Sequence, residues 1–187
     1  GDSMVEKIYN DIKNNMQKTV DHYQKEVSKI RTGRASVSML DSILVDYYGT
    51  PQPLKNMSNI STPEAQLIVI TPFDPSSLEL IESSISAADL GMTPNNDGSV
   101  IRLNVPVLTE ERRKDLVKIL HQLIEDGRIS IRNIRRDGND QIKKLQTEDN
   151  LSEDNVKIEL ENIQDLTNQY IDKLNNLQSD KEKEIMP

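Results

Sequence analysis

The sequence contains no cysteine and no tryptophan, and Phe73 is its single phenylalanine. Without cysteine, the chain has no disulfide bonds, no cysteine-ligated zinc sites and no thiol nucleophile. Aromatic residues make up only 3% of the chain, which argues against base-stacking platforms and aromatic ligand pockets. Any nucleic acid that binds this chain is therefore expected to be held by charge and shape.

Long hydrophobic runs are also missing. The longest, such as Leu67 to Ile70, are far too short to cross a bilayer, and the N-terminal region lacks the apolar core of a signal peptide. We therefore expect a cytoplasmic protein with no membrane partner. A length of 187 residues with 35% apolar side chains is enough to bury a sizeable core.

Residues that commonly build enzyme sites are sparse. The two histidines, His22 and His121, are far apart in the sequence, and neither "RTGRAS" nor "NNDGS" matches a phosphate-binding loop or a dinucleotide fingerprint. The stretch "DGND" lies within a helical pattern and lacks the glutamate that closes a calcium loop. We predict a protein that is not an enzyme, with no catalytic residues, metal site, cofactor or small-molecule substrate. A hydrolase that uses carboxylates of the middle region is the last of the alternatives.

Three segments carry the three-and-four spacing of amphipathic helices. The first runs from Val5 to Ile30, the second from Thr109 to about Thr147, and the third begins at Ser152, a helix-capping residue, and continues through Leu177. Gly127 and Gly138 fall on the apolar seam of the second segment, which predicts close approach of a neighbouring helix. Because three such seams cannot be left in water, the pattern predicts a three-helix bundle.

Residues 31–106 have a different character. Besides Pro106 at its boundary, the region has six prolines, which exclude long helices, at positions 51, 53, 63, 72, 75 and 94. Three stretches have the apolar spacing of strands, "SILVDYYG", "AQLIVITP" and "SVIRLNV", and residues 75–88 have helical spacing. The region therefore predicts a small domain of β/α/β type.

The order of these segments predicts an α+β fold with a discontinuous bundle domain. Residues 1–30 and 107–187 form the three-helix bundle, and residues 31–106 are inserted between its first and second helices. Two connections of this kind allow rotation about a hinge. We place the hinge near residues 31–35 and 104–107, and its residues are Arg31, Thr32, Gly33, Arg34, Val105 and Pro106.

Charge is distributed unevenly along the chain, whose formal net charge is -8. Residues 31–106 hold four basic against eight acidic side chains, and residues 148–187 hold four against eleven. Residues 109–136 hold eight basic against five acidic side chains, which makes the second helix the only clearly basic element. Nucleic acid is therefore expected to bind there and not on the small domain.

Arginines on the second helix form a row beside its apolar seam. Steps of three and four connect Arg113, Val117, His121, Ile124, Arg128, Arg132 and Arg135, one residue beyond the seam, and Arg136 widens the row. The planar guanidinium group matches two phosphate oxygens at once, so a row of arginines suits contacts with phosphate.

An alternative explanation is that these arginines pair with acids of the third helix. That helix offers four carboxylates for such pairs, Glu159, Glu161, Asp165 and Asp172. In this case the chain would be a helical adaptor that binds a protein partner through its acidic faces. Periodicity alone leaves both explanations open.

Five motifs together resemble the ribosome recycling factor family of bacteria and organelles: "KIRTGRAS", "VDYYGTPQPL", "ADLGMTPNNDGSVIRL", "PVLTEERRKDL" and "IRNIRRDGND". The resemblance covers the chain from Met4 to Pro187, and the five motifs occur in the order and at the spacing typical of the family. It implies an elongated, L-shaped monomer of two domains joined by a hinge.

The resemblance also implies a function and its partners. Such a factor binds the post-termination ribosome and acts with elongation factor G and GTP to release ribosomes from mRNA and split the subunits. The bundle holds large-subunit ribosomal RNA at the intersubunit face, a role carried over to Arg113, Arg132 and Arg135. Arg128 and Arg136 are added from the row, and Arg31 at the hinge is a further candidate for RNA contact.

Overall fold

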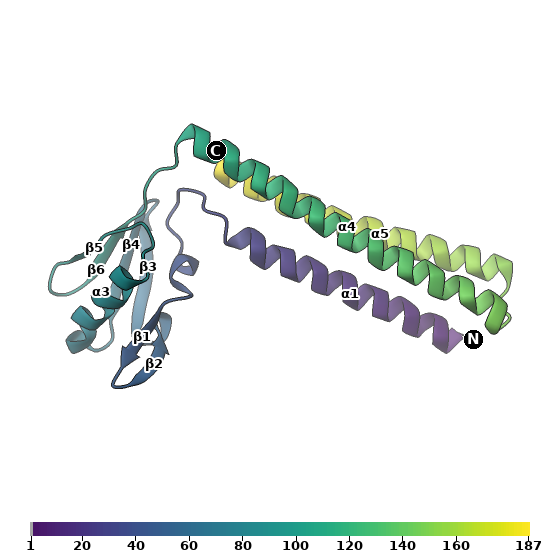
Figure 1. Cartoon of the computed structure of the whole chain (residues 1–187), viewed down its shortest axis with the longest axis horizontal. Coiled ribbons are helices and arrows are strands. Elements are labelled where there is room, and N and C mark those ends of the chain that lie inside the picture. Colours follow the sequence, from purple (N-terminus) through teal and green to yellow (C-terminus); the bar gives the residue numbers. More distant parts are fainter. Residues whose placement is uncertain (1) are drawn as a thin grey trace. The chain divides into compact units, whose positions relative to one another are not determined.

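The computed structural model describes residues 2–187 and divides them into two compact units (Figure 1). One unit combines the chain up to Ile30 with Glu111–Pro187, and the other is Arg31–Glu110. Gly1, which we assigned to the bundle domain, lies outside the described residues. The expected boundary after Pro106 falls slightly early, because residues 107–110 group with the small unit. The α+β class, with long helices and a separate sheet unit, is confirmed.

The helical unit consists of three helices that run side by side (Figure 1): α1 (Asp2–Ser28), α4 (Glu110–Glu148) and α5 (Glu153–Ile185). The predicted cap of α5 is confirmed, since the Ser152 hydroxyl accepts a hydrogen bond from the Asn155 backbone N–H at 3.1 Å. Glu153 and Asp154 follow in the first turn, where acidic side chains suit the positive end of a helix. All three predicted helices are present, and α5 continues well beyond Leu177.

The core of the helical unit is formed by apolar side chains from all three helices. On α4, seven residues of the predicted apolar seam are buried: Leu116, Leu120, Gly127, Ile131, Gly138, Ile142 and Leu145. Leu123 and Ile134, which the same spacing placed in the seam, are only half-buried, whereas Ile124, which we placed in the arginine row, is fully buried. Each fully buried leucine or isoleucine stabilises the fold by about 1.5–3 kcal/mol. The arginine row therefore borders the core directly.

The two glycines of α4 lie where side chains of neighbouring helices approach its backbone closely. A Cβ atom at Gly127 would lie 3.1 Å from Leu174 of α5 and 3.1 Å from the Tyr23 ring of α1. At Gly138, a Cβ atom would lie 2.9 Å from Cγ1 of Ile12 and closer still to its Cδ1. The predicted close approach is confirmed, and it allows α4 to contact both partners.

The small unit contains two antiparallel sheets. A hairpin joins β1 (Leu44–Tyr47) and β2 (Thr50–Pro53), and a four-stranded sheet has the order β3-β4-β6-β5. Its strands are β3 (Ser58–Glu64), β4 (Leu67–Pro72), β5 (Pro94–Asn96) and β6 (Ile101–Asn104). The helical elements are η1 (Val37–Leu40), α2 (Leu54–Met57), η2 (Pro75–Ser77) and α3 (Leu78–Ala87).

The small unit has its own core, built from the inward faces of β4, β6 and α3. Ile68 and Ile70 on β4, Ile101 on β6 and Ile81 on α3 are fully buried. Strands β2, β3 and β5 were not predicted, because prolines and polar residues interrupt their patterns. All three are edge strands, where proline costs no interior hydrogen bond.

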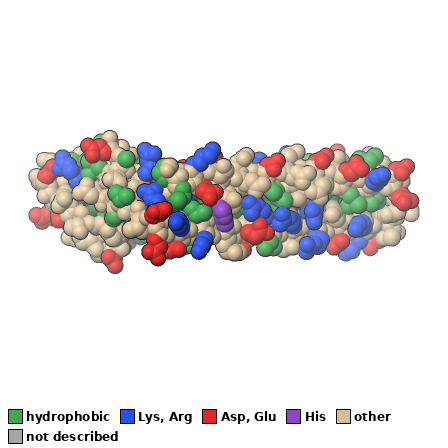
Figure 2. Space-filling view, turned by 90° about the horizontal axis from the view of Figure 1, so that it is seen from above, with side chains coloured by type: hydrophobic (Ala, Val, Ile, Leu, Met, Phe, Trp, Pro, Cys, Tyr) green, Lys and Arg blue, Asp and Glu red, His purple; other side chains and the backbone are tan. Residues whose placement is uncertain are grey.

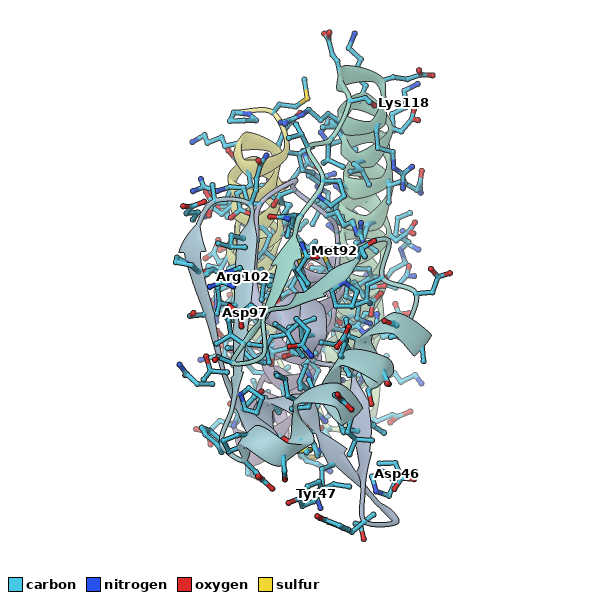
Figure 3. All side chains as sticks on the ribbon, turned by 90° about the vertical axis from the view of Figure 1, so that its left-hand side faces the viewer. Asp46, Tyr47, Met92, Asp97, Arg102 and Lys118 are labelled. Atoms are coloured by element: carbon cyan, nitrogen blue, oxygen red, sulfur yellow. The ribbon has the colours of Figure 1, made fainter. Side chains whose placement is uncertain are left out.

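The turn between β5 and β6 is organised by one carboxylate. Asp97 accepts hydrogen bonds from the backbone N–H groups of Val100 and Ser99, each at 2.9 Å, and pairs with Arg102 (Figure 3). The Val100 backbone bond, followed by Arg102 and Ser99, lowers the pKa of this carboxyl well below its ordinary value. The charged form of Asp97 therefore stabilises the folded turn.

We predict that Gly138→Ala lowers the free energy of unfolding by up to about 2 kcal/mol, because crowding against Ile12 outweighs the gain in helix propensity. In an Ile12→Val background, which lacks the crowded Cδ1 atom, this cost falls by about 1 kcal/mol. Urea unfolding of the parent, both single variants and the double variant measures this coupling. Strict additivity would show that α4 does not approach α1 as described.

We predict that Asp97→Asn lowers the thermal midpoint at neutral pH and weakens its dependence on acid. A carboxyl with a lowered folded-state pKa adds stability above its ordinary pKa, near 3.8, and this stability is lost as the pH falls below that value. Melting curves between pH 7 and pH 2 measure the difference between parent and variant. Parallel pH profiles for the two proteins would contradict the assignment.

Candidate nucleic-acid interface

The five predicted RNA-binding arginines all lie on α4, but the structure does not bring all five together. Arg113 is fifteen positions before Arg128, or roughly 22 Å along the helix at about 1.5 Å per residue. Its Nη1 donates to the Ile185 carbonyl at the end of α5, at 2.7 Å. The remaining four, Arg128, Arg132, Arg135 and Arg136, occupy consecutive turns, and we refer to them as the arginine cluster.

Helix α5 holds two members of the cluster through amide side chains. Arg128 donates from Nε to Asn175 at 2.9 Å and from Nη2 to Gln178 at 3.4 Å. Arg135 donates from Nη1 to Gln164 at 3.3 Å. An amide oxygen orients a guanidinium group without neutralising its charge. The helix thus positions these arginines and leaves the cluster positive.

The acidic side chains of α5 do not take part in this arrangement. Among residues 2–187, no carboxylate of α5 lies within ion-pair distance of Arg128, Arg132, Arg135 or Arg136. The pairs that the alternative explanation required, with Glu159, Glu161, Asp165 or Asp172, are therefore not formed by the cluster. The positive charge of the arginine cluster is therefore available to an external anion. Helical spacing in the sequence had left this point open.

Glu125 is the carboxylate that contacts the cluster. Its Oε2 lies 3.0 Å from Nη1 of Arg128, and its Oε1 lies 3.5 Å from Nη1 of Arg132. The Arg128 side chain is only 19% exposed, whereas that of Arg132 is 41% exposed. Arg128 therefore serves mainly to join α4 to α5, and Arg132 presents its guanidinium group to solvent.

The cluster as a whole has the chemistry of a phosphate-binding surface. Arg136 is exposed and donates to Asn133 at 3.3 Å, again a neutral partner. Four guanidinium groups with one neighbouring carboxylate give a local excess of positive charge, and Figure 2 shows basic side chains gathered over the helices. Each phosphate that such groups neutralise releases counterions, so binding here would depend strongly on salt.

The predicted hinge residues are engaged to different degrees within the small unit. Val105 is buried, and its N–H donates to the Gln66 carbonyl at 2.8 Å. Arg31 donates from Nη2 to the Leu90 carbonyl. Gly33 has a φ of +78°, and a Cβ atom there would lie 3.3 Å from Cγ of Leu108, so glycine suits this position. Thr32 accepts a weak hydrogen bond from the N–H of Arg34 at 3.4 Å.

The structure also exposes aromatic side chains that composition gave no reason to expect. Tyr48, in the turn after β1, is 86% exposed and Phe73, after β4, is 68% exposed. Tyr47, labelled in Figure 3, packs edge-on against Tyr48 and donates to the Asp74 carboxylate at 2.9 Å. These rings lie in the small unit, whose charge is acidic.

Comparison with known proteins agrees with this architecture. A model of the family described as "Ribosome recycling factor" matches residues 23–186. The chain belongs to the ribosome recycling factor family. The family that the five sequence motifs predicted is thereby confirmed.

Relatives in this family are similar to the chain over nearly its whole length. The ribosome-recycling factor of Bacillus licheniformis is 46% identical over 183 residues, which cover 98% of this chain and 99% of the relative. That of a Nostoc species is 53% identical over 170 residues, covering 91% and 93%. Both units of the chain therefore fall within the family match.

Two solved structures carry the same fold. The solution structure of a ribosome recycling factor is 41% identical, with a TM-score of 0.79 and 97% of each chain covered. The second is the Thermus thermophilus factor, described with Escherichia coli elongation factor G bound to the E. coli post-termination complex. It is 39% identical, with a TM-score of 0.67 and coverage of 98% and 99%.

Metal-binding groups and membrane-spanning helices are absent from the described part of the chain. Within residues 2–187, no group of three or more histidine, aspartate or glutamate side chains is arranged to hold a metal ion. No helix in the same range is both long enough and apolar enough to span a membrane.

We predict that Arg128→Ala lowers the free energy of unfolding by about 1–3 kcal/mol, because it removes the bonds to Asn175 and Gln178 and leaves Glu125 without its closer partner. Arg136→Ala is the matched control, since Arg136 is exposed and donates only to its own helix. Chemical unfolding distinguishes the two. Equal stabilities would show that Arg128 does not join the helices.

Proposed function

We propose that this protein is a translation factor that binds the post-termination ribosome. With elongation factor G and GTP, it releases the ribosome from mRNA and separates the subunits for recycling. The observation that carries the proposal is family membership across both units, with 46% identity over 98% of the chain to a ribosome-recycling factor. The solved family member described on a post-termination complex with elongation factor G supports the choice of partners.

We further propose that the arginine cluster anchors the helical unit to large-subunit ribosomal RNA at the intersubunit face, with Arg113 as a separate contact. Arg132 and Arg136 are accessible, and no α5 carboxylate in the described chain neutralises them. Arg128 and Arg135 are oriented by amides and add to the local potential. The acidic small unit would be repelled by RNA, which favours binding through the helical unit.

The proposed mechanism is mechanical. RNA contacts hold the helical unit while elongation factor G acts on the small unit, and the long packed helices transmit the resulting force between subunits. GTP hydrolysis belongs to the partner, so the chain itself needs no catalytic side chain. We propose a monomer that works in the cytoplasm and is not an enzyme.

We also propose that the connections near residues 31–35 and 104–107 act as a hinge during this step. Val105 and Arg31 are tied to the small unit by their bonds to Gln66 and Leu90. Gly33 has the backbone freedom needed in the first connection, and Pro106 restricts the second. Thr32 and Arg34 complete the first connection.

The adaptor alternative predicts a different use of the arginines. It needs the arginines neutralised inside the protein, yet within residues 2–187 one carboxylate, that of Glu125, lies within ion-pair distance of the four guanidinium groups. RNA anchoring is therefore favoured over an adaptor function.

We predict that Arg132→Ala combined with Arg135→Ala weakens binding to vacant ribosomes about 10- to 100-fold near physiological salt. Loss of two phosphate contacts also reduces the salt slope by up to about 2. Co-sedimentation at several salt concentrations measures both quantities. Lys7→Ala combined with Lys157→Ala, which removes the same charge from exposed positions elsewhere, serves as the control and should bind nearly as well as the parent.

A polysome-breakdown assay tests recycling itself. The parent protein, added with elongation factor G and GTP, should convert polysomes to smaller particles, and the double arginine variant should do so poorly at equal concentration. No effect of the parent on polysomes would rule out the proposed function. Full activity in the double variant, with reduced fold stability, would support intramolecular pairing instead.

A further inference from the structure

The arginine cluster contains one charge that opposes its proposed role. Glu125 contacts both Arg128 and Arg132, and no other carboxylate among residues 2–187 lies within ion-pair distance of the four arginines. On a surface that binds phosphate, a carboxylate in contact with two of the arginines reduces the attraction. A glutamine at this position would also accept hydrogen bonds from arginine, so hydrogen bonding alone does not require the charge.

Arg128 holds the carboxylate of Glu125 in position. Asn175 and Gln178 of α5 hold the guanidinium group of Arg128, whose side chain is 19% exposed, and Oε2 of Glu125 lies 3.0 Å from its Nη1. An ordinary surface glutamate rotates away when an anion approaches. Glu125 is retained, because Arg128 is largely removed from water and Glu125 is its only carboxylate partner in the described chain.

Arg132 is the member of the cluster that this carboxylate affects most. Its contact with Oε1 is long, at 3.5 Å, and is the one polar contact of Arg132 within residues 2–187. Most of its donors remain available for phosphate. A phosphate bound there would lie roughly 7 Å from the Glu125 carboxylate, where Coulomb repulsion in water is about equal to the thermal energy, or about a threefold change in affinity.

We propose that Glu125 is a built-in counter-charge that lowers the affinity of the arginine cluster for RNA phosphate by acting on Arg132. The inference rests on the proposed RNA-binding function and adds a limit to it. A factor that acts in repeated cycles must leave its binding site, and most increases in affinity at a given interface slow dissociation. A carboxylate held by the partly buried Arg128 sets that limit without any conformational change.

Asp126 provides a matched control for the charge itself. It is the next residue along α4, it is exposed, and its carboxylate accepts a hydrogen bond from Gln122 at 2.9 Å instead of contacting an arginine. Asp126→Asn therefore removes the same net charge from the same turn of the helix, but from a different face.

The test compares Glu125→Gln, Asp126→Asn and the parent in binding to purified large ribosomal subunits over a series of salt concentrations. Glu125→Gln should bind about threefold tighter and show a steeper salt dependence, by up to about 0.9 in slope. Asp126→Asn should bind like the parent. In an Arg132→Ala background, Glu125→Gln should have almost no effect, because the repulsion acts on the phosphate held by Arg132.

A second variant adds a carboxylate beside another arginine of the cluster and leaves the contact between Glu125 and Arg128 unchanged. Gln164→Glu places a carboxylate against Arg135, where an amide oxygen now accepts at 3.3 Å, and should weaken binding about threefold. This variant keeps the proposal testable if Glu125→Gln lowers the melting temperature.

Three results would overturn the inference. Unchanged or weaker binding by a folded Glu125→Gln variant would show that the carboxylate only positions Arg128 and Arg132. Equal tightening by Asp126→Asn would show a general charge effect, and tightening that persists in the Arg132→Ala background would remove Arg132 from the explanation. A parent protein with no salt-dependent binding to large subunits would instead overturn the proposed RNA anchoring together with this inference.

Discussion

Burial of the apolar seam of α4 is the constraint on which the helical unit depends. The helix supplies Leu116, Leu120, Ile124 and Ile131 to the core, and helices from opposite ends of the chain cover them. Gly127 and Gly138 let α1 and α5 approach to within contact of the α4 backbone. Because α1 and α5 cover α4 on two sides, the side chains of α4 fall into three groups. One is the buried seam, one lies on the flank beside α5, and one is exposed.

The arginine cluster that we propose binds RNA lies on the flank of α4 beside α5. Amide side chains there hold Arg128 and Arg135 in place, and one carboxylate, Glu125, contacts Arg128 and Arg132. A neutral acceptor orients a guanidinium group and leaves its positive charge in place, whereas a carboxylate neutralises that charge. The acidic composition of α5 therefore does not cancel the charge of the arginine cluster, because no α5 carboxylate among residues 2–187 lies within ion-pair distance of its four arginines.

Much of the fold could be predicted because its signals are local. The three long helices follow from apolar spacing, the start of α5 follows from Ser152, and the close contacts of α4 follow from its glycines. Strands β4 and β6 were visible as apolar runs. Strands β2, β3 and β5 were not, because they form by pairing with a neighbour, and short polar edge strands carry no periodicity of their own.

For the candidate site, the sequence by itself determined that arginines line one side of a basic helix, because helical spacing alone places residues three and four apart on a common face. Only the tertiary structure decided their separate roles. Arg128 is largely buried against α5, Arg132 is accessible beside Glu125, and Arg113 reaches the end of α5 instead of the cluster. Those roles depend on which side chains of α5 face α4, and that is settled by packing between segments distant in the sequence.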